Sequence, residues 1–409
     1  MLQPLKVLYV HQYFNSPKDS GGTRSYELAT RMAKAGMDVH MITSDRQGTG
    51  SRWTTHAVDG VTVHRFPVPY RSEMGYSRRI GAFARFAWSA TRRALSLRGD
   101  VVYASSTPLT VAIPAIACRV LQRTPYVFEV RDLWPEIPIA LRAISNPALK
   151  LLARMLERIA YAGAAHVIAL SPGMAEGVRR SGGKGTPVTV ASNACDAWLA
   201  HAPPGEVQNF RRQRFPDLLD RPAAVYAGTF GMLNGVGYLV EIALELRRRG
   251  STVALIAVGG GAEFDIVRAA AAREGVLDRN LFVVPRIPKQ EIPLLLGMAD
   301  ACMSLFIDEP AMWNNSANKF FDALAAGRPV IVNYGGWQCE LVERTGAGLR
   351  IPARDAKAAA GLLDRFLADR PALIRAGTAA LELGKREFDR DRLCTKVINI
   401  VRDVTDGTH

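Results

Sequence analysis

The sequence has few cysteines, and their spacing suits neither a disulfide framework nor a zinc site. Five cysteines are scattered over 409 residues without a C-x-x-C pair. An odd and dispersed set argues against both kinds of site and favours a reducing cytoplasm. No clustered set of histidines and carboxylates is apparent either. We therefore expect no catalytic metal and no cofactor.

Long apolar runs are missing as well. No stretch approaches the roughly 18–20 apolar residues needed to cross a bilayer. The N-terminal residues carry Lys6 within a short apolar run, unlike a secretory signal. Any membrane contact is therefore expected to be peripheral, by a cytoplasmic protein on the inner face of the cell membrane.

The composition that remains is typical of a folded protein of two domains. Apolar residues make up 48% and charged residues 22% of the chain, which excludes a disordered or low-complexity class. The length of 409 residues exceeds one ordinary core and suits two domains of about 150–200 residues each.

Charge is unevenly distributed along the chain. Residues 1–200 hold 25 Lys and Arg against 13 Asp and Glu, whereas the remaining residues hold 27 against 25. A basic first half suggests an anionic partner: a lipid surface, a phosphate-bearing substrate or nucleic acid. Solvated surface charge is the alternative interpretation.

Short runs rich in Val, Ile and Tyr alternate with helical patterns, which predicts an α/β fold with parallel sheets and crossover helices. The expected strands are 6–10, 39–43, 61–66, 101–104, 126–130, 166–170 and 188–191 in the first half, then 223–226, 253–258, 281–284, 301–305, 330–333 and 349–351. We place the boundary within 193–222, which gives domains 1–200 and 201–390 and a closing helix and tail at 391–409.

Glycine-bearing loops follow three of these strands and precede helices. They contain Gly22, Gly228 and the run 259–261. Glycine permits close backbone approach, and unpaired amides at a helix start attract anions. Because open α/β sheets bind ligands at the carboxyl ends of their strands, these loops predict a nucleotide or phosphate site. A simple turn is the alternative for Gly22.

Residues 313–331 form the most informative segment. Ser316 is expected to cap a helix that Gly327 and Pro329 end. Asp322 then lies one to two turns into this helix. A carboxylate there can accept hydrogen bonds from ribose hydroxyls while the helix amides face a diphosphate.

With its other motifs, the chain resembles glycosyltransferase family four of the GT-B fold, especially the bacterial surface-polysaccharide and aminosugar transferases. The resemblance spans nearly the whole chain. Its motifs are His-Gln-Tyr-Phe at 11–14 with Gly-Gly at 21–22, Arg-Asp-Leu-Trp-Pro-Glu at 131–136, Leu-Ser-Pro-Gly-Met at 170–174, Tyr-Ala-Gly at 226–228, and the segment 316–331.

The resemblance implies two Rossmann-like domains that face each other across a cleft. It implies a retaining transferase that moves a sugar, an N-acetylated aminosugar among the candidates, from a UDP-sugar donor. The acceptor would be lipid-linked or a saccharide, in the biosynthesis of a surface polysaccharide such as O-antigen or capsule.

The resemblance also implies site residues. Asp322 matches the second acid of the family's E-x7-E motif, which holds the ribose, and the amides of 317–319 would hold the distal phosphate. Arg286 matches the segment that meets the nucleobase, and Gly22 would lie at the phosphate and acceptor edge of the first domain. The expected donor-binding residues are Gly22, Gly228, Arg286, Glu309, Asn314, Ser316, Ala317, Asn318, Lys319 and Asp322.

Two positions depart from the family pattern. Asn314 stands where the family has its first Glu, so the contact to the donor sugar is altered or is supplied by Glu309. Asn234 stands where the family has a Lys, which removes one positive charge from the diphosphate site. Lys319 or Arg24 is expected to compensate.

Catalytic groups are expected mainly from the Arg-Asp motif. Arg131-Asp132 stands where many relatives carry His-Asp, so Asp132 is the first choice for acid–base work, with Glu129 and Glu136 behind it. A structural cap is the alternative for Asp132. His11 either contacts the acceptor or packs beneath its loop. In the family the leaving phosphate helps to deprotonate the acceptor on the same face, so the protein's share is largely electrostatic.

Residues 77–97 are predicted to form a helix with two unlike sides. Basic residues share one side and apolar residues the other: Arg78, Arg79, Arg85, Arg92 and Arg93 against Ile80, Phe83, Ala87, Trp88, Ala94 and Leu95. This pattern predicts an interfacial helix at an anionic membrane, where a lipid-linked acceptor would be available. A core-packing helix with a solvated basic side is the alternative.

Other functions fit the residues less well. A dinucleotide oxidoreductase needs a full G-x-G-x-x-G fingerprint followed by an acid, and neither half supplies that set. A GT-B nucleotide-sugar epimerase would have no need for the basic amphipathic helix predicted at residues 77–97. A basic nucleic-acid-binding protein should show a recognised reading module, and none is apparent. We expect no nucleic acid partner.

Overall fold

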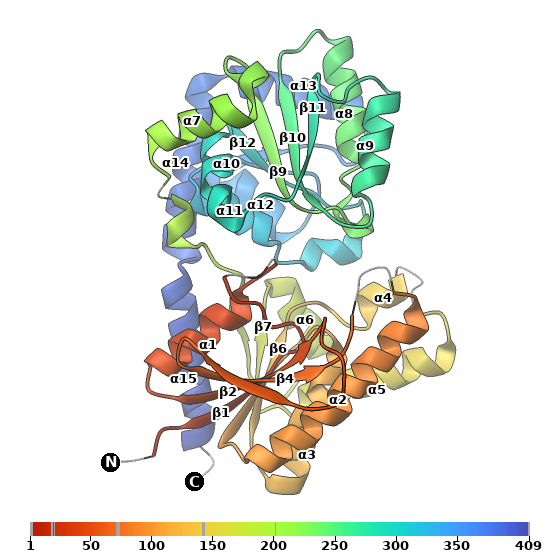
Figure 1. Cartoon of the computed structure of the whole chain (residues 1–409), viewed down its shortest axis with the longest axis vertical. Coiled ribbons are helices and arrows are strands. Elements are labelled where there is room, and N and C mark those ends of the chain that lie inside the picture. The colour runs from red at the N-terminus through yellow and green to blue at the C-terminus, as the bar shows by residue number, and fades with distance from the viewer. Residues whose placement is uncertain are drawn as a thin grey trace. The chain divides into compact units, whose positions relative to one another are not determined.

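The computed structural model describes residues 3–17, 19, 21–70, 74–140, 144–200 and 202–407. The chain divides into two units. The first comprises Met1–Ser192 together with Asp391–His409, and the second comprises Asn193–Arg390. Each unit has its own sheet and its own apolar core (Figure 1).

The first unit is built on an eight-stranded sheet in the order β3-β4-β2-β1-β5-β6-β7-β8. The strands are β1 (Lys6–Val10), β2 (Asp38–Asp45), β3 (Thr54–Val58), β4 (Val61–Pro67), β5 (Val101–Ser105), β6 (Tyr126–Val130), β7 (His166–Ala169) and β8 (Val188–Val190). All seven strands expected in this half are confirmed. β3 was not predicted, because it is an exposed edge strand that pairs antiparallel with β4 and shows no apolar alternation.

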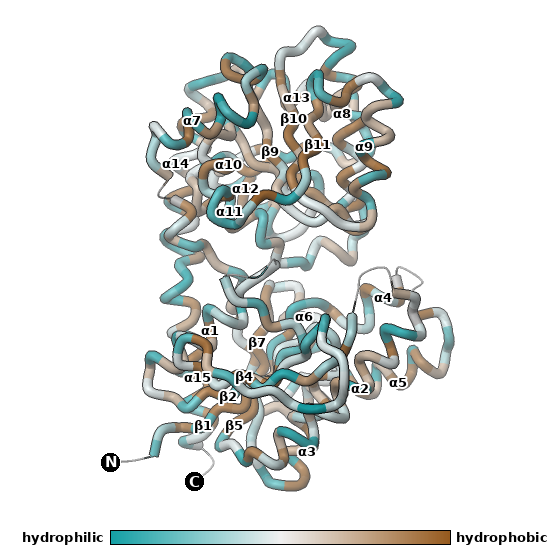
Figure 2. The backbone as a smooth tube through the Cα atoms, viewed as in Figure 1, coloured by the Kyte–Doolittle hydropathy of each residue, from teal (hydrophilic) through white to brown (hydrophobic). Residues whose placement is uncertain are grey.

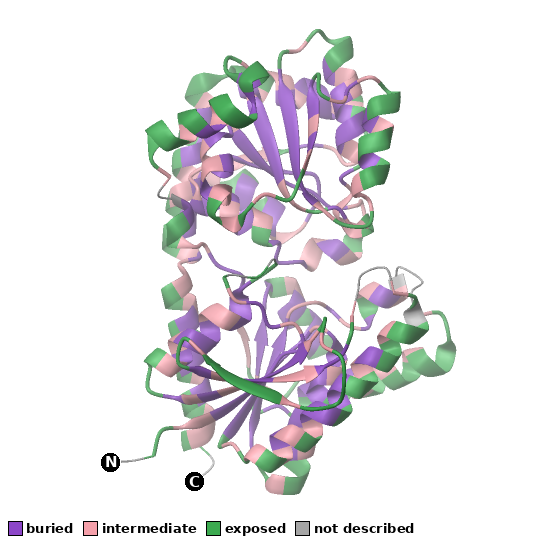
Figure 3. Ribbon diagram, in the orientation of Figure 1, coloured by how far each residue is buried: buried purple, intermediate pink, exposed green. Residues whose placement is uncertain are grey.

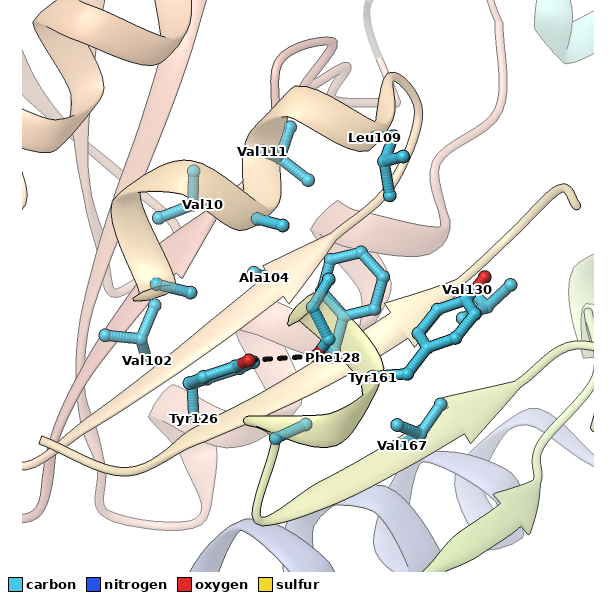
Figure 4. Close-up of a cluster of buried hydrophobic side chains, with 14 of the residues drawn as sticks. Val10, Val102, Ala104, Leu109, Val111, Tyr126, Phe128, Val130, Tyr161 and Val167 are labelled. Carbon is cyan, nitrogen blue, oxygen red and sulfur yellow. Dashed lines mark hydrogen bonds between the residues drawn. The ribbon is translucent and has the colours of Figure 1, made fainter. Parts of the chain in front are cut away.

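Helices cover both faces of this sheet and bury its apolar side chains. On one face lie α2 (Tyr76–Leu97), α3 (Ala112–Gln122), α5 (Pro147–Ala162) and α6 (Pro172–Arg180). On the other lie α1 (Arg24–Lys34) and the closing helix α15 (Arg390–Asp406). Figure 4 shows part of the first core, where Phe128 of β6 packs with Tyr161 of α5. Because β1, β5 and β6 are covered on both faces, their sequences are continuously apolar rather than alternating.

The second unit carries a six-stranded, all-parallel sheet in the order β11-β10-β9-β12-β13-β14. The strands are β9 (Ala223–Thr229), β10 (Ala254–Gly260), β11 (Leu281–Pro285), β12 (Ala301–Ser304), β13 (Val330–Val332) and β14 (Gly348–Arg350). The helices are α7 (Pro204–Arg214), α8 (Tyr238–Arg248), α9 (Phe264–Arg273), α10 (Ile292–Met298), α11 (Asn318–Ala325), α12 (Trp337–Thr345), α13 (Ala356–Ala368) and α14 (Arg370–Glu387). All six expected strands are confirmed.

The central strands of both sheets are hydrophobic and buried, whereas the edge strand β3 and the outer sides of the helices are polar or exposed (Figures 2 and 3). Among the helices within the described part of the chain, none combines the length and the apolar content that a membrane crossing requires.

The strand orders place one topological switch point in each unit. In the first sheet the chain runs from β1 to β2 on one side and later returns to β5 on the other side. In the second sheet β10 and β12 flank β9 in the same way. Loops diverge at the carboxyl ends of the strands at such points, and open α/β sheets bind ligands there.

Candidate functional site

Two glycine loops meet at the switch point of the second unit. A Cβ added at Gly259, where φ is +157°, would lie 1.8 Å from the carbonyl oxygen of Gly228. A Cβ added at Gly261, where φ is +146°, would lie 2.4 Å from the carbonyl oxygen of Phe230. Only glycine is accommodated at these positions. The loops after β9 and β10 therefore pack backbone against backbone at the carboxyl edge of the sheet.

Lys319 of α11 reaches the first of these loops. Its ammonium donates a hydrogen bond to Asn234 Oδ1 over 2.8 Å and lies 5.2 Å from the ring centroids of both Tyr226 and Phe306. The side chain passes directly over Gly228, where an added Cβ would come within 2.9 Å of Lys319 Cδ. The lysine that was expected to compensate for Asn234 thus lies in hydrogen-bond contact with it.

Asp322 lies one turn beyond Lys319 on α11. Burial raises the pKa of its carboxyl to about 7, with Asp196 adding to the rise while Arg390, Lys319 and Lys289 oppose it. Burial lowers the pKa of Lys319 to about 8, against the opposing effect of Asp322. Asp196 is itself held by Arg390, whose Nη2 donates to it over 2.9 Å. No donor within the described residues forms a hydrogen bond with the Asp322 carboxylate, so its oxygens are available to accept bonds from a ligand.

The start of α11 differs from the predicted one. The N-cap residue is Ala317, and no side chain caps the helix. The prediction that Ser316 caps it is wrong, because the Ser316 hydroxyl instead accepts a hydrogen bond from the backbone amide of Asn193 over 3.1 Å. The Asn193 side-chain amide also donates to the Ser316 carbonyl over 2.6 Å. With no side-chain cap, the amides of Asn318 and Lys319 are the anion-attracting groups of this helix start.

The other expected donor residues lie around the same edge. The exposed guanidinium of Arg286 passes over the β10 loop, with its Nε 3.0 Å from the position of a Cβ added at Gly260. Glu309 caps the short helix η6 (Pro310–Asn314) through a 3.4 Å bond from the Ala311 amide, and Asn314 ends that helix. The chain leading to Glu309 contacts the β9 loop, since Ile307 N donates to Leu233 O over 3.0 Å.

In the first unit, Arg24 and Glu129 form a buried ion pair. Arg24 Nε donates to Glu129 Oε2 over 3.0 Å, and its terminal nitrogens donate to the carbonyls of Ser192 and Ala191 over 2.5 and 2.8 Å. Burial alone would raise the pKa of Glu129, but Arg24, then Arg131, and hydrogen bonds from Arg24 and Ser105 lower it to about 2. The Arg24 guanidinium is therefore fixed inside the unit, which argues against it as the compensating phosphate ligand.

Glu129 is fully buried and also accepts hydrogen bonds from Tyr103 and Ser105, both over 2.7 Å. A carboxylate with three internal donors and a low pKa is poorly suited to take up a proton near neutral pH. We assign Glu129 a structural role that joins β5, β6 and α1.

His11, the residue directly after β1, has a defined tautomer. Its Nδ1 lies 3.1 Å from the Ser105 carbonyl oxygen and its Nε2 lies 3.2 Å from Arg131 Nη1. A carbonyl can only accept and a guanidinium can only donate, so Nδ1 carries the proton and Nε2 accepts. Burial, together with the charge of Arg131, lowers the pKa of His11 to about 3. The imidazole is thus neutral and orients Arg131.

Asp132 has fewer internal partners than Glu129. It accepts a hydrogen bond from the Thr107 hydroxyl over 3.0 Å, and burial raises its pKa above the ordinary value. Glu136 is exposed at the start of α4 (Glu136–Ala140). Gly22 is exposed just ahead of α1. Asp132 therefore remains the first choice among the three acids.

A row of half-buried aromatic rings adjoins Asp132. Tyr13, Tyr70, Phe83 and Trp134 follow one another with centroid distances of 5.1, 6.0 and 6.4 Å. Sequence reasoning did not identify this row, because its members come from four separate segments. The pairs His11–Arg131 and Lys319–Asn234 were also not predicted, since 120 and 85 residues separate their members. Their positions after strands that flank a switch point are the signal that could have indicated them.

Helix α2 packs differently from the predicted interfacial helix. Ala87 and Ala94 of its expected outer apolar side are buried in the core, together with Phe86. Arg93 donates to His64 Nδ1 over 2.9 Å, so not all of its arginines face solvent. Trp88 remains exposed, at 68%. Ile80 is also exposed, and Phe83 and Leu95 are half-buried. The small residues of the predicted apolar side therefore pack in the core while its large ones remain accessible, and the membrane contact of this helix stays a prediction.

In the part of the chain that the structure describes, no group of three or more histidine, cysteine or carboxylate side chains is placed to hold a metal ion.

Two family descriptions match the chain: "Glycosyl transferase 4-like domain" over residues 21–194 and "Glycosyl transferases group 1" over residues 221–369. The chain is similar to the GDP-mannose-dependent alpha-(1-6)-phosphatidylinositol monomannoside mannosyltransferase of Mycobacterium tuberculosis, with 27% identity over 61% of this chain and 73% of that protein. It is also similar to the probable glycosyltransferase WbjE of Pseudomonas aeruginosa, with 22% identity over 88% of this chain and 89% of the other.

Solved structures show the same fold. Sucrose-phosphate synthase from Thermosynechococcus elongatus superposes with a TM-score of 0.80 at 17% identity, covering 98% of this chain and 100% of that one. Anabaena HepE in complex with UDP-glucose superposes with a TM-score of 0.72 at 17% identity and the same coverage. The two Rossmann-like units are thus those of the GT-B fold.

Proposed function

Since the chain belongs to the GT-B glycosyltransferases, with a glycosyl transferase 4-like first domain and a glycosyl transferases group 1 second domain, we propose that it transfers a sugar from a UDP-sugar. The transfer would retain the anomeric configuration, and the acceptor would be lipid-linked or a saccharide. The pathway would be the synthesis of a surface polysaccharide. The observation that carries the proposal is the arrangement at α11: an ammonium beside a glycine loop and, one turn further on, a carboxylate that accepts no hydrogen bond from the described residues.

The donor would bind at the carboxyl edge of the second sheet. Asp322 would accept hydrogen bonds from the ribose hydroxyls, and Lys319 with the first amides of α11 would hold the diphosphate. Negative charge grows on the diphosphate as the bond from the anomeric carbon to the phosphate oxygen breaks. A fixed ammonium in a partly buried position stabilises that charge without reorganisation.

The nucleobase is assigned by weighing two relatives. The mycobacterial relative is named for GDP-mannose, whereas the HepE structure holds UDP-glucose. We propose UDP, with Arg286 and its neighbours beside the base. GDP is the competing donor nucleotide, and the ligand panel described below decides between them.

The acceptor side would be provided by the first unit. Asp132 has a raised pKa and accepts a hydrogen bond from the Thr107 side chain, which suits a group that shares the acceptor's proton. His11 would act through Arg131 as a positioning residue. The row from Tyr13 to Trp134 offers aromatic faces to a saccharide ring or a lipid chain.

We further propose that turnover needs no metal and that the enzyme works peripherally at the cytoplasmic side of an anionic membrane. Lys319 and the helix amides would supply the positive charge that a divalent ion provides elsewhere. Loss of activity with chelator, restored by Mn²⁺, would contradict the first of these proposals.

A thermal-shift panel tests the proposed function. We expect UDP and one or more UDP-sugars to raise the melting temperature of the full chain, because they bind only the folded state. The same compounds should shift a Lys319→Met variant much less. A shift with GDP and none with UDP would mean that the donor is a GDP-sugar and not a UDP-sugar. No shift with any nucleotide would contradict the transferase assignment at this site.

A further inference from the structure

Helix α5 is apolar on two opposite sides. Its inward side contributes Ala160 and Tyr161 to the core of the first unit, where Tyr161 packs on Phe128. The hydroxyl of Tyr126 donates to the Ala160 carbonyl over 2.8 Å (Figure 4). Asn146 caps the helix start through bonds to two backbone amides. The helix is therefore firmly held, and its orientation on the sheet is fixed.

The outward side of α5 carries a stripe of large apolar residues, which we call the α5 stripe: Leu151, Leu152, Met155 and Ile159. Each of the four is between 50% and 61% exposed. At 100° per residue they fall opposite Glu157, Ala160 and Tyr161, the buried residues of the helix. Figure 3 shows this outer side as exposed. Because a helix that is apolar all round is normally buried, the stripe calls for a partner.

The charges around the stripe are predominantly positive. Helices α2, α3 and α5 cover the same core, and together they contain nine basic residues: Arg78, Arg79, Arg85, Arg92, Arg93, Arg119, Lys150, Arg154 and Arg158. Their single acid is Glu157, which is 4% exposed. Arg154 and Arg158 are exposed and flank the stripe on α5 itself. Helix α6 of the same layer adds the exposed acid Glu176 beside Arg179 and Arg180. The outer surface of this helical layer therefore presents apolar side chains among a clear excess of cations.

We propose that the α5 stripe is the apolar anchor by which this protein docks onto an anionic lipid surface. Leu151, Leu152, Met155 and Ile159 would enter the boundary between headgroups and acyl chains, while Arg154 and Arg158 contact lipid phosphates. This inference rests on the proposed peripheral membrane association and places an apolar contact on α5, in addition to the apolar residues of α2 that remain exposed.

Lipid suits these charges better than a second copy of the chain. A two-fold contact through the stripe would bring the arginines of both copies together, and like charges across an interface are costly. An anionic surface neutralises the same arginines and accepts the apolar side chains in one contact.

Flotation of the full chain with vesicles tests the proposal. The vesicles are phosphatidylcholine alone or phosphatidylcholine with one quarter phosphatidylglycerol. The test variant is Leu151→Gln, Met155→Gln and Ile159→Gln in one chain. The matched control replaces three exposed apolar residues of the second unit, Leu219→Gln, Ile266→Gln and Ile374→Gln. All six side chains are solvent-exposed, so both variants are expected to fold.

Wild type and the control are expected to float with the anionic vesicles, and the stripe variant is expected to partition roughly tenfold less. Arg154→Gln with Arg158→Gln should lower the preference for anionic over neutral vesicles. Equal flotation of the stripe variant and wild type would overturn the proposal, as would failure of wild type to bind either vesicle. A wild-type dimer that the stripe variant converts to monomer would also overturn it, in favour of a second copy.

The same samples separate this proposal from the donor assignment. The thermal shift with UDP should be equal in wild type and the stripe variant, because α5 belongs to the first unit. A normal UDP shift without vesicle binding would overturn the docking surface alone. Vesicle binding without any nucleotide shift would overturn the proposed function alone.

Discussion

The two switch points of this chain are built alike, yet they use their charged groups differently. At the first, Arg24 and Glu129 satisfy each other inside the unit, and His11 accepts from Arg131. At the second, Lys319 has a neutral amide as its hydrogen-bond partner and Asp322 has no donor among the described residues. The pKa values differ accordingly, since Glu129 is lowered to about 2 and Asp322 is raised to about 7. Charged groups that a fold leaves unsatisfied indicate where a ligand completes it.

The largest effect is expected on stability, from loss of the buried Arg24–Glu129 ion pair of the first unit. Arg24→Ala leaves Glu129 buried without its cation and should cost about 3–5 kcal/mol of unfolding free energy, as measured by urea denaturation. Arg31→Ala on the same helix is the matched control, because its pairs with Glu27 and Asp391 are partly exposed and are worth about 0–1 kcal/mol. Equal losses of unfolding free energy in the two variants, with nucleotide binding impaired by Arg24→Ala, would contradict this assignment. Arg24 would then be a ligand-binding residue and not a structural one.

The same pair gives a pH dependence. Because the pKa of Glu129 is lowered in the folded protein, its contribution to stability is full above the unfolded value of about 4.3 and is lost as pH falls toward 2.

The next largest effect concerns Asp132, a half-buried acid of the first edge that is not held in an ion pair. Asp132→Asn should lower kcat by about 100-fold while the UDP thermal shift stays unchanged. Burial raises the pKa of Asp132, so wild-type turnover should fall on acidification at a higher pH than for an ordinary aspartate. Glu136→Gln, at an exposed acid nearby, should keep near-normal kcat. Equal turnover of Asp132→Asn and wild type would remove Asp132 from the reaction.

At the second switch point, Lys319→Met should weaken UDP binding by about 30-fold, or about 2 kcal/mol, in a calorimetric titration. Lys357→Met, an exposed lysine of the same unit, is the control and should bind normally. Since the pKa of Lys319 is about 8, wild-type affinity should also decline as pH rises through 8.

A charge swap sharpens this prediction. Asn234→Lys combined with Lys319→Met returns an ammonium to the β9 loop, within the reach of a 2.8 Å contact, and should recover much of the affinity. Failure of the swap, together with normal binding by Lys319→Met alone, would show that the diphosphate is held elsewhere.

The smallest effect is expected from the ribose contact. Asp322→Asn should bind UDP about tenfold more weakly and should lose the preference of wild type for UDP over 2′-deoxy-UDP. Unchanged discrimination between these two nucleotides would exclude Asp322 from the ribose site.

Asp322 also gives a stability prediction of opposite sign to that of Glu129. Its folded pKa is raised to about 7, so its contribution to stability is full below the unfolded value and is lost as pH rises toward 7. Asp322→Asn without ligand should therefore raise the melting temperature at pH 8 and have little effect at low pH.

The sequence predicted the fold well because buried parallel strands have a strong local signature. β1 and β6 begin and end at their expected residues, since both are short runs rich in Val and aromatic residues. β3 was missed because its side chains are exposed and its sequence carries no apolar period. Helix α7 lies in the stretch without a strong period that was taken for the boundary.

The site was predicted less completely, because its contacts depend on tertiary structure. The motifs indicated Lys319, Asp322 and Gly228. No spacing in the sequence, however, shows that Lys319 contacts Asn234, that Arg24 pairs with Glu129, or that the Asn193 amide donates to the Ser316 hydroxyl. Likewise, helical periodicity found two unlike sides in residues 77–97 but could not tell which of them faces the core. The exposed stripe of α5 shows the same limit, since an apolar residue is buried only where another element covers it.

A crystal structure of the protein grown with UDP tests the central claim most directly. We predict the ribose hydroxyls within hydrogen-bond distance of the Asp322 carboxylate, and the diphosphate beside Lys319 Nζ and the first amides of α11. UDP bound away from α11, or density for the nucleotide missing from this edge at saturating concentration, would contradict the account.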